Sequence, residues 1–107
     1  MTVLQQEFRQ LATAFLDSHP EVPHEWRDVP SRWWGDRIDL VCGVGSANEV
    51  FASLHAGGQI TVGTVGGEDD DFEDFGRGLS DQAVAQEAFE RLVAVLLAEG
   101  YLKSDAE

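Results

Sequence analysis

The chain has 107 residues, 43% of them hydrophobic, and its 20 Asp and Glu against 7 Lys and Arg give a formal net charge of −13 at pH 7. This length accommodates one small domain, residues 1–107, and the apolar fraction excludes a wholly disordered chain. The negative charge excludes nucleic-acid phosphates and anionic membranes as partners and favours basic proteins.

A helix is predicted at the start of the chain. Thr2 is a suitable N-cap, with Gln5 three residues later as its capping-box partner. Pro20 ends the helix, because proline cannot continue it. The apolar residues recur at spacings of four, three and four, at Leu4, Phe8, Leu11 and Phe15.

The segment 20–36 is predicted to be an extended or turn-rich connection, because it contains all three prolines of the chain, Pro20, Pro23 and Pro30. It also holds Trp26, Trp33 and Trp34. We favour a flap over one sheet face for these three indoles, with an exposed recognition surface as the alternative.

Three strands follow, at 37–44, 49–55 and 59–65, because apolar residues alternate there with other residues. Short turns at 45–48 and 56–58 connect them, so the strands form an antiparallel meander. The expected inward residues are Ile38, Leu40, Cys42, Val44, Val50, Ala52, Leu54, Ile60 and Val62.

An acidic hinge, residues 66–78, is expected between the strands and the last helix. Six of the seven residues from Glu68 to Asp74 are carboxylates, and residues 66–107 carry a net charge of −9 against −4 for residues 1–65. Ser80 is the expected N-cap of the last helix and Gly100 its C-terminal signal, followed by a short mobile tail at 103–107.

These elements predict an α+β fold of order α-β-β-β-α. Two helices would cover one face of a three-stranded antiparallel meander, in a two-layer sandwich. No linker divides the chain.

No catalytic site, metal site or cofactor is expected. The histidines stand in no nucleophile motif, and Cys42 is expected to face the core, where a thiol is inert. A calcium loop that starts at Asp69 would need Gly at its sixth position and Glu at its twelfth, where Asp74 and Ser80 stand.

A cytoplasmic location is expected. The lone Cys42 allows no internal disulfide, which favours a reducing compartment. The N-terminus lacks a basic segment followed by an apolar one, and no run approaches the roughly 18 apolar residues of a membrane span.

The acidic hinge is the predicted partner-binding site. Aromatic side chains surrounded by carboxylates suit a basic protein surface, because the rings desolvate while the acids steer and pair with Arg or Lys. One of the two hinge phenylalanines is expected to close the core instead. The predicted contact residues are Glu68, Asp69, Asp70, Asp71, Phe72, Glu73, Asp74, Phe75 and Trp33.

In size, α/β build, lack of a catalytic motif and the stretch Asp70-Asp71-Phe72-Glu73-Asp74-Phe75, the chain resembles the small acidic immunity proteins of bacterial toxin systems. This resemblance implies a non-catalytic inhibitor that binds a cognate toxin domain and blocks its basic active site.

Two alternatives remain open. A secretion-chaperone-like protein would present an apolar groove to an extended client and would usually dimerise. An acidic DNA mimic would align Glu87 and Glu90 of the last helix with the hinge on one surface. The sequence leaves the oligomeric state open, with a monomer favoured.

Overall fold

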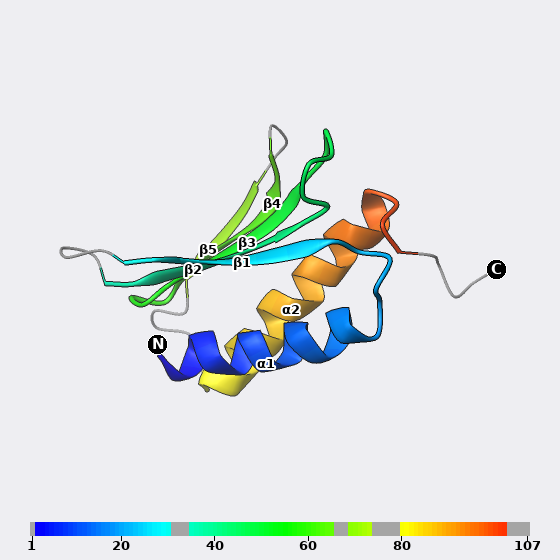
Figure 1. Cartoon of the computed structure of the whole chain (residues 1–107). Coiled ribbons are helices and arrows are strands. Elements are labelled where there is room, and N and C mark those ends of the chain that lie inside the picture. Colours follow the sequence, from blue (N-terminus) through cyan, green and yellow to red (C-terminus); the bar gives the residue numbers. More distant parts are fainter. Residues whose placement is uncertain (1, 31–34, 66–68, 74–79, 103–107) are drawn as a thin grey trace.

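The computed structural model has two layers, a sheet and a pair of helices that cover one of its faces (Figure 1). It describes residues 2–30, 35–65, 69–73 and 80–102, with the backbone alone at 69–73. The elements in chain order are α1 (Val3–Asp17), β1 (His24–Val29), β2 (Arg37–Cys42), β3 (Val50–His55), β4 (Gln59–Thr64), β5 (Asp69–Glu73) and α2 (Asp81–Ala98).

The α+β class, the antiparallel meander and the two packed helices are confirmed. The number of strands was wrong, because the sheet runs β1-β2-β3-β4-β5 instead of holding three strands. Both added strands lie at its edges. β1 falls within the predicted connection 20–36, and β5 falls within the predicted acidic hinge.

The alternation of apolar residues in the sequence does not reveal β1 and β5, because an edge strand is stabilised mainly by backbone bonds to one neighbour. In β1 only Trp26 and Val29 are partly buried, and the other four residues are exposed. β5 pairs with β4 from Gln59↔Glu73 to Gly63↔Asp69, although three of its five residues are consecutive aspartates. Non-local backbone pairing therefore overrides the local composition.

The core lies between the layers. The expected inward residues of β2, β3 and β4 are buried, apart from Val44, which lies beyond β2 and is 41% exposed. Leu11 and Phe15 of α1 pack only at the margin of the core, while Ala12 and Leu16 are buried. The buried residues of the helices are Leu4, Gln5, Phe8, Ala12 and Leu16 in α1, and Val84, Ala85, Ala88, Leu92 and Leu96 in α2.

Gln5 is a buried polar residue that joins α1 to the sheet. Its side-chain oxygen accepts from the backbone N–H of Thr2, which completes the predicted capping box. Its Nε2 donates to the carbonyl oxygens of Asp36 and Leu54, at 3.0 and 2.9 Å. The side chain is fully buried, and these bonds satisfy its amide.

A tyrosine holds the end of α2 against the loop between β2 and β3. The hydroxyl of Tyr101 donates to the backbone oxygen of Asn48 at 2.9 Å and lies 2.6 Å from the hydroxyl of Ser46. Gly43 makes room for it: its φ is +72°, and a Cβ there would overlap the Tyr101 side chain. Gly100, with φ +83°, ends the helix as predicted.

Candidate protein-binding surface

The predicted acidic hinge is partly an edge strand. Asp69 to Glu73 form β5, so this part of the expected loop is held by backbone bonds to β4. The expected contact residues Glu68, Asp74, Phe75 and Trp33 lie outside the described residues.

The pairing register places the β5 residues in rows across the sheet. Residues directly opposite one another in an antiparallel pair occupy the same face. Asp70 stands opposite Val62 and Phe72 opposite Ile60, so positions 70 and 72 belong to rows of the helix-covered face. Positions 69, 71 and 73 belong to rows of the open face, which no described helix covers (Figure 1).

The open face combines apolar and charged side chains. One row runs through Glu25, Val41, Phe51, Gly63 and position 69, and the next row runs from Arg27 through Asp39 to position 71. Val41 is buried and Phe51 is partly buried. An apolar centre beside carboxylates is thus built on the face that the helices leave uncovered.

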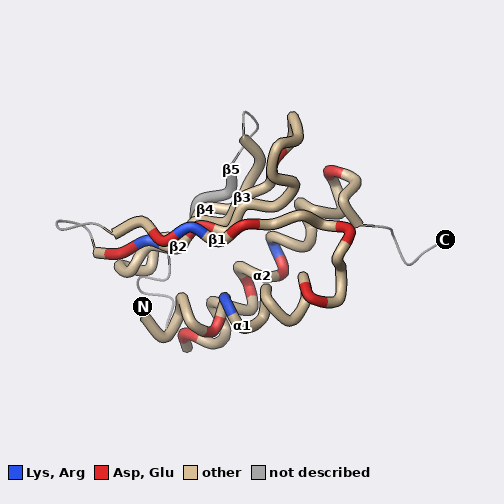
Figure 2. The backbone as a smooth tube through the Cα atoms, in the orientation of Figure 1, with Lys and Arg blue, Asp and Glu red and all other residues tan. Residues whose placement is uncertain are grey.

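Every arginine that the structure describes lies close to a carboxylate. Arg27 pairs with Glu25 at 2.8 Å, and Arg37 pairs with Asp39 at 2.9 Å, both on the open face. On the helices, Arg91 pairs with Glu87 at 3.1 Å, and Arg9 lies 3.8 Å from Asp28 of β1. Figure 2 shows how few basic positions stand among the acidic ones. The cations are therefore already neutralised locally, and the excess carboxylates set the field that a partner meets.

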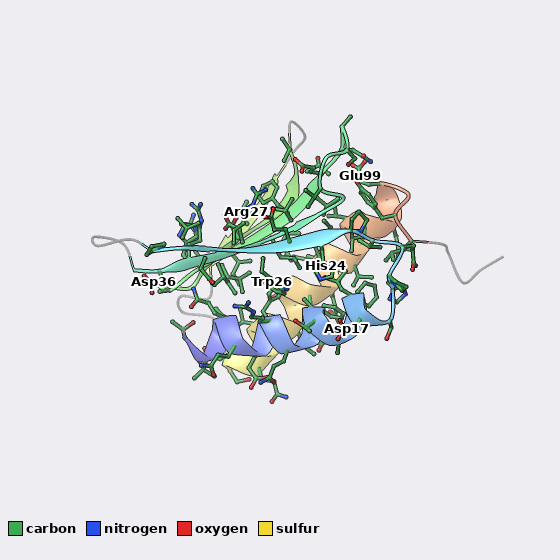
Figure 3. The ribbon with its side chains drawn as sticks, viewed as in Figure 1. Asp17, His24, Trp26, Arg27, Asp36 and Glu99 are labelled. Atoms are coloured by element: carbon green, nitrogen blue, oxygen red, sulfur yellow. The ribbon has the colours of Figure 1, made fainter. Side chains whose placement is uncertain are left out.

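Trp26 belongs to the core side of the sheet and not to a flap. It lies on β1 between the sheet and α1, while Arg27 projects to the opposite side (Figure 3). Its ring packs edge-on against Phe8, with centroids 6.1 Å apart, and the Arg9 guanidinium lies 5.0 Å from its centroid. Sequence reasoning missed this contact, because it did not identify β1 as a strand.

Asp36, which stands just before β2, lies at the end of the sheet where β5 finishes. The backbone N–H of Ala56, in the turn between β3 and β4, donates to the Asp36 oxygen at 2.9 Å. The next residues of that turn lead into Gln59, which pairs with Glu73. The start of β2 thus lies at the same end of the sheet as the last residue of β5.

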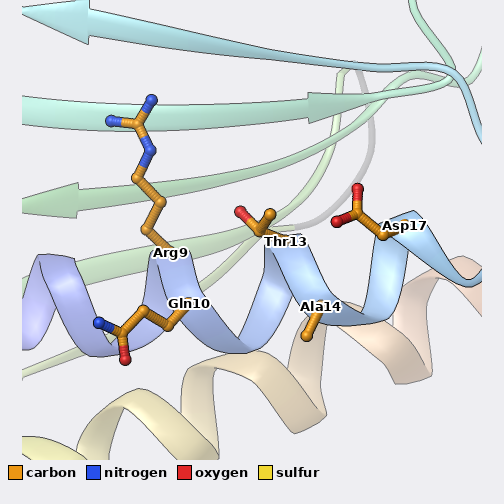
Figure 4. A pocket seen from close by; sticks show the side chains of 5 residues that line it. All are labelled: Arg9, Gln10, Thr13, Ala14 and Asp17. Carbon is orange, nitrogen blue, oxygen red and sulfur yellow. The ribbon is translucent and has the colours of Figure 1, made fainter.

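A hollow of about 370 Å³ lies along one flank of α1, where Gln10 and Ala14 point away from the strands (Figure 4). Arg9 extends from it towards the strands. The hollow is lined by Arg9, Gln10, Thr13, Ala14 and Asp17. It is a shallow surface whose exposed walls are mostly apolar, and its lining holds no pair of groups arranged for acid–base catalysis.

The described residues contain no group of three or more His, Cys, Asp or Glu placed to hold a metal ion. Burial raises the pKa of the Cys42 thiol to about 12, so the thiol stays protonated well above neutral pH. No helix in the described parts of the chain has the length and apolarity to cross a membrane.

Comparison with protein-family models, curated proteins and solved structures found no match to this chain.

Proposed function

We propose that this protein is a non-catalytic, immunity-type inhibitor that binds a basic toxin domain and occludes its active surface. The observation that carries the proposal is the pairing of the acidic strand β5 with β4. An acidic run that would be mobile as a free loop is instead a strand whose backbone is held by β4. A backbone that is already held loses less conformational freedom on binding, so more of the interaction energy appears as affinity.

The open face supplies the rest of the binding surface. The excess negative charge would steer a basic partner towards the protein and speed association. Phe51 lies in the row that leads to Asp69, next to the buried Val41, and its partly exposed ring offers an apolar contact beside the acids. Phe51 therefore replaces Phe72 as the proposed aromatic anchor, because position 72 belongs to a helix-covered row. Such an anchor slows release.

The surface supports this function better than the two alternatives. A chaperone groove would hold an extended client, whereas the hollow of α1 is shallow and is lined by residues of that one helix. A DNA mimic would need the acids of α2 beside those of β5. α2 lies on the covered side of the sheet, away from the open-face positions 69, 71 and 73.

The test is capture from a lysate of the native host at about 0.05 and 0.15 M salt, followed by mass spectrometry. We expect one basic protein, retained stoichiometrically at the higher salt, where exposed charges more than about 8 Å apart are largely screened. Its activity should then be abolished by one equivalent of the chain. A mixture of basic proteins that is lost as salt rises would overturn the proposal.

The matched controls are two triple variants with equal loss of charge. Asp69→Asn, Asp71→Asn and Glu73→Gln neutralise the open-face positions of β5. Asp17→Asn, Glu21→Gln and Glu90→Gln neutralise exposed acids elsewhere. We expect the β5 variant to lose the partner and the distributed variant to keep it. Equal loss in both would mean that net charge alone is responsible.

A further inference from the structure

The outer edge of β1 has backbone groups with no strand to pair with among the described residues, because β1 is the first strand of the sheet. The N–H of Gly43 donates to the oxygen of Pro23 at 2.6 Å, which marks this pair as a hydrogen-bonded one. Bonded and non-bonded pairs alternate along an antiparallel ladder. Glu25, Arg27 and Val29 therefore bond to β2, and the N–H and C=O groups of His24, Trp26 and Asp28 point outward.

We propose that a second copy of this chain pairs with this edge, with the two-fold axis at Trp26. Two identical antiparallel strands must place one residue opposite itself. An axis at Trp26 places Glu25 opposite Arg27 of the partner subunit, and Arg27 opposite Glu25 of the partner subunit. It also places His24 opposite Asp28 of the partner subunit. About six backbone hydrogen bonds would form, through the outward groups of the three alternate residues.

Other axes are disfavoured by charge. An axis at Glu25, Arg27 or Asp28 puts that charge directly opposite its own copy, and like charges directly opposite are destabilising. The axis at Trp26 alone gives opposite charges across the ladder. Charged residues usually protect an edge from pairing. In β1, however, the order of the charged residues places opposite charges across from one another when two copies of the strand pair in the Trp26 register.

The geometry of the side chains agrees with this register. The pair of Glu25 and Arg27 across the axis is a non-hydrogen-bonded pair, in which opposite side chains come closest. Both side chains are about half exposed, at 50% and 52%, and already pair with each other within one copy. Each arginine would then lie between its own glutamate and that of the partner subunit.

There is also room for the second copy beside α1. The hollow of about 370 Å³ between Arg9 and Asp17 lies along one flank of the helix, and Arg9 of its lining contacts Trp26 and Asp28. The two-fold axis would bring the two α1 flanks face to face. β5 lies at the opposite edge of the sheet, so the surface proposed for the toxin would stay free (Figure 1).

The experiment is sedimentation equilibrium of the purified chain at about 0.15 M salt, which limits repulsion between two copies of net charge −13. We expect a reversible monomer–dimer equilibrium. Glu25→Arg or Arg27→Glu alone should raise the dissociation constant at least about tenfold, because each reversal makes two symmetric pairs repulsive. The double variant Glu25→Arg with Arg27→Glu should return it to within about threefold of the wild type.

Asp28→Pro removes an outward N–H and leaves the bonds to β2 intact, so it should be monomeric, while Asp28→Ala, which keeps the N–H, should still dimerise. A wild-type chain that stays monomeric at millimolar concentration would overturn the proposal. So would a dimer that neither single reversal nor Asp28→Pro weakens. The oligomeric state is independent of the proposed inhibitor function, since an inhibitor can act as a monomer or as a dimer. A dimer is also compatible with the chaperone-like alternative.

Discussion

Single residues show where local physical chemistry decides the stability of this small domain. Gln5 is the one buried polar side chain among the described residues. Its amide satisfies two backbone carbonyls and one backbone N–H at the junction of α1 with the sheet. An apolar residue of similar size would fill the space but leave those backbone groups without partners.

We therefore expect Gln5→Leu to lower the free energy of unfolding by about 3 kcal/mol, because unsatisfied buried groups keep their full desolvation cost. Urea unfolding monitored by circular dichroism measures this loss. Gln6→Leu is the control, since Gln6 is exposed in the same helical turn and should change stability by no more than about 0.5 kcal/mol. Equal effects of the two substitutions would show that the Gln5 bonds contribute little.

Cys42 gives a pH dependence whose sign follows from burial. Its folded pKa is raised from 9.0 to about 12, so between these values the folded state keeps a proton that the unfolded state has lost. Stability is therefore unaffected below pH 9 and falls as pH rises towards 12.

From pH 8 to pH 10.5 this thiol should remove about 2 kcal/mol of stability, on the scale of 1.36 kcal/mol per pKa unit. Other groups titrate in the same range, so the comparison is with Cys42→Ala, which lacks the thiol. We expect the wild type to lose about 2 kcal/mol more than the variant in urea unfolding at the two pH values. Parallel losses would mean that the thiolate is tolerated in the core.

At the scale of elements, contacts distant in sequence hold the parts together. The end of α2 is joined to the loop between β2 and β3 through Tyr101, Ser46 and Asn48. That loop contains two glycines with positive φ, Gly43 at +72° and Gly45 at +88°. Only Gly43 is in contact with the tyrosine, whereas a Cβ at Gly45 meets nothing within 4 Å.

These glycines make a matched pair of substitutions. Gly43→Ala and Gly45→Ala both place a side chain in the left-handed region, at a cost of about 1 kcal/mol each. We expect Gly43→Ala to lose about 1–3 kcal/mol more, because its methyl group displaces the Tyr101 hydroxyl. Thermal unfolding of both variants measures the difference. Identical losses would show that the tyrosine contact is not a significant part of the fold.

At the scale of the whole molecule, charge governs how the protein meets other molecules. With the described arginines paired to carboxylates, the net charge of −13 leaves an attractive field for basic partners. Long-range attraction acts on the encounter and is screened by salt, whereas buried contacts act on release.

For the partner identified by capture, we expect an association rate that falls at least about tenfold from 0.01 to 0.15 M salt. The variant Asp69→Asn, Asp71→Asn and Glu73→Gln should associate more slowly and show a flatter salt dependence. Phe51→Ala should leave the association rate within about threefold and raise the dissociation rate. Stopped-flow measurements separate the two rates. An unchanged association rate for the β5 variant would contradict the assigned binding surface.

The amino-acid sequence by itself determined both helices, their caps and the inward faces of three strands. These features depend on neighbours three, four or two positions away, so periodicity and capping residues record them. It also determined that the acids are concentrated after residue 66.

Only the tertiary structure decided that His24–Val29 and Asp69–Glu73 are strands, because their stability comes from backbone bonds to segments elsewhere in the chain. The same is true of the burial of Gln5, whose acceptors lie 31 and 49 residues away. Which face the acids of β5 belong to is set by register, and register depends on pairing that no local pattern specifies.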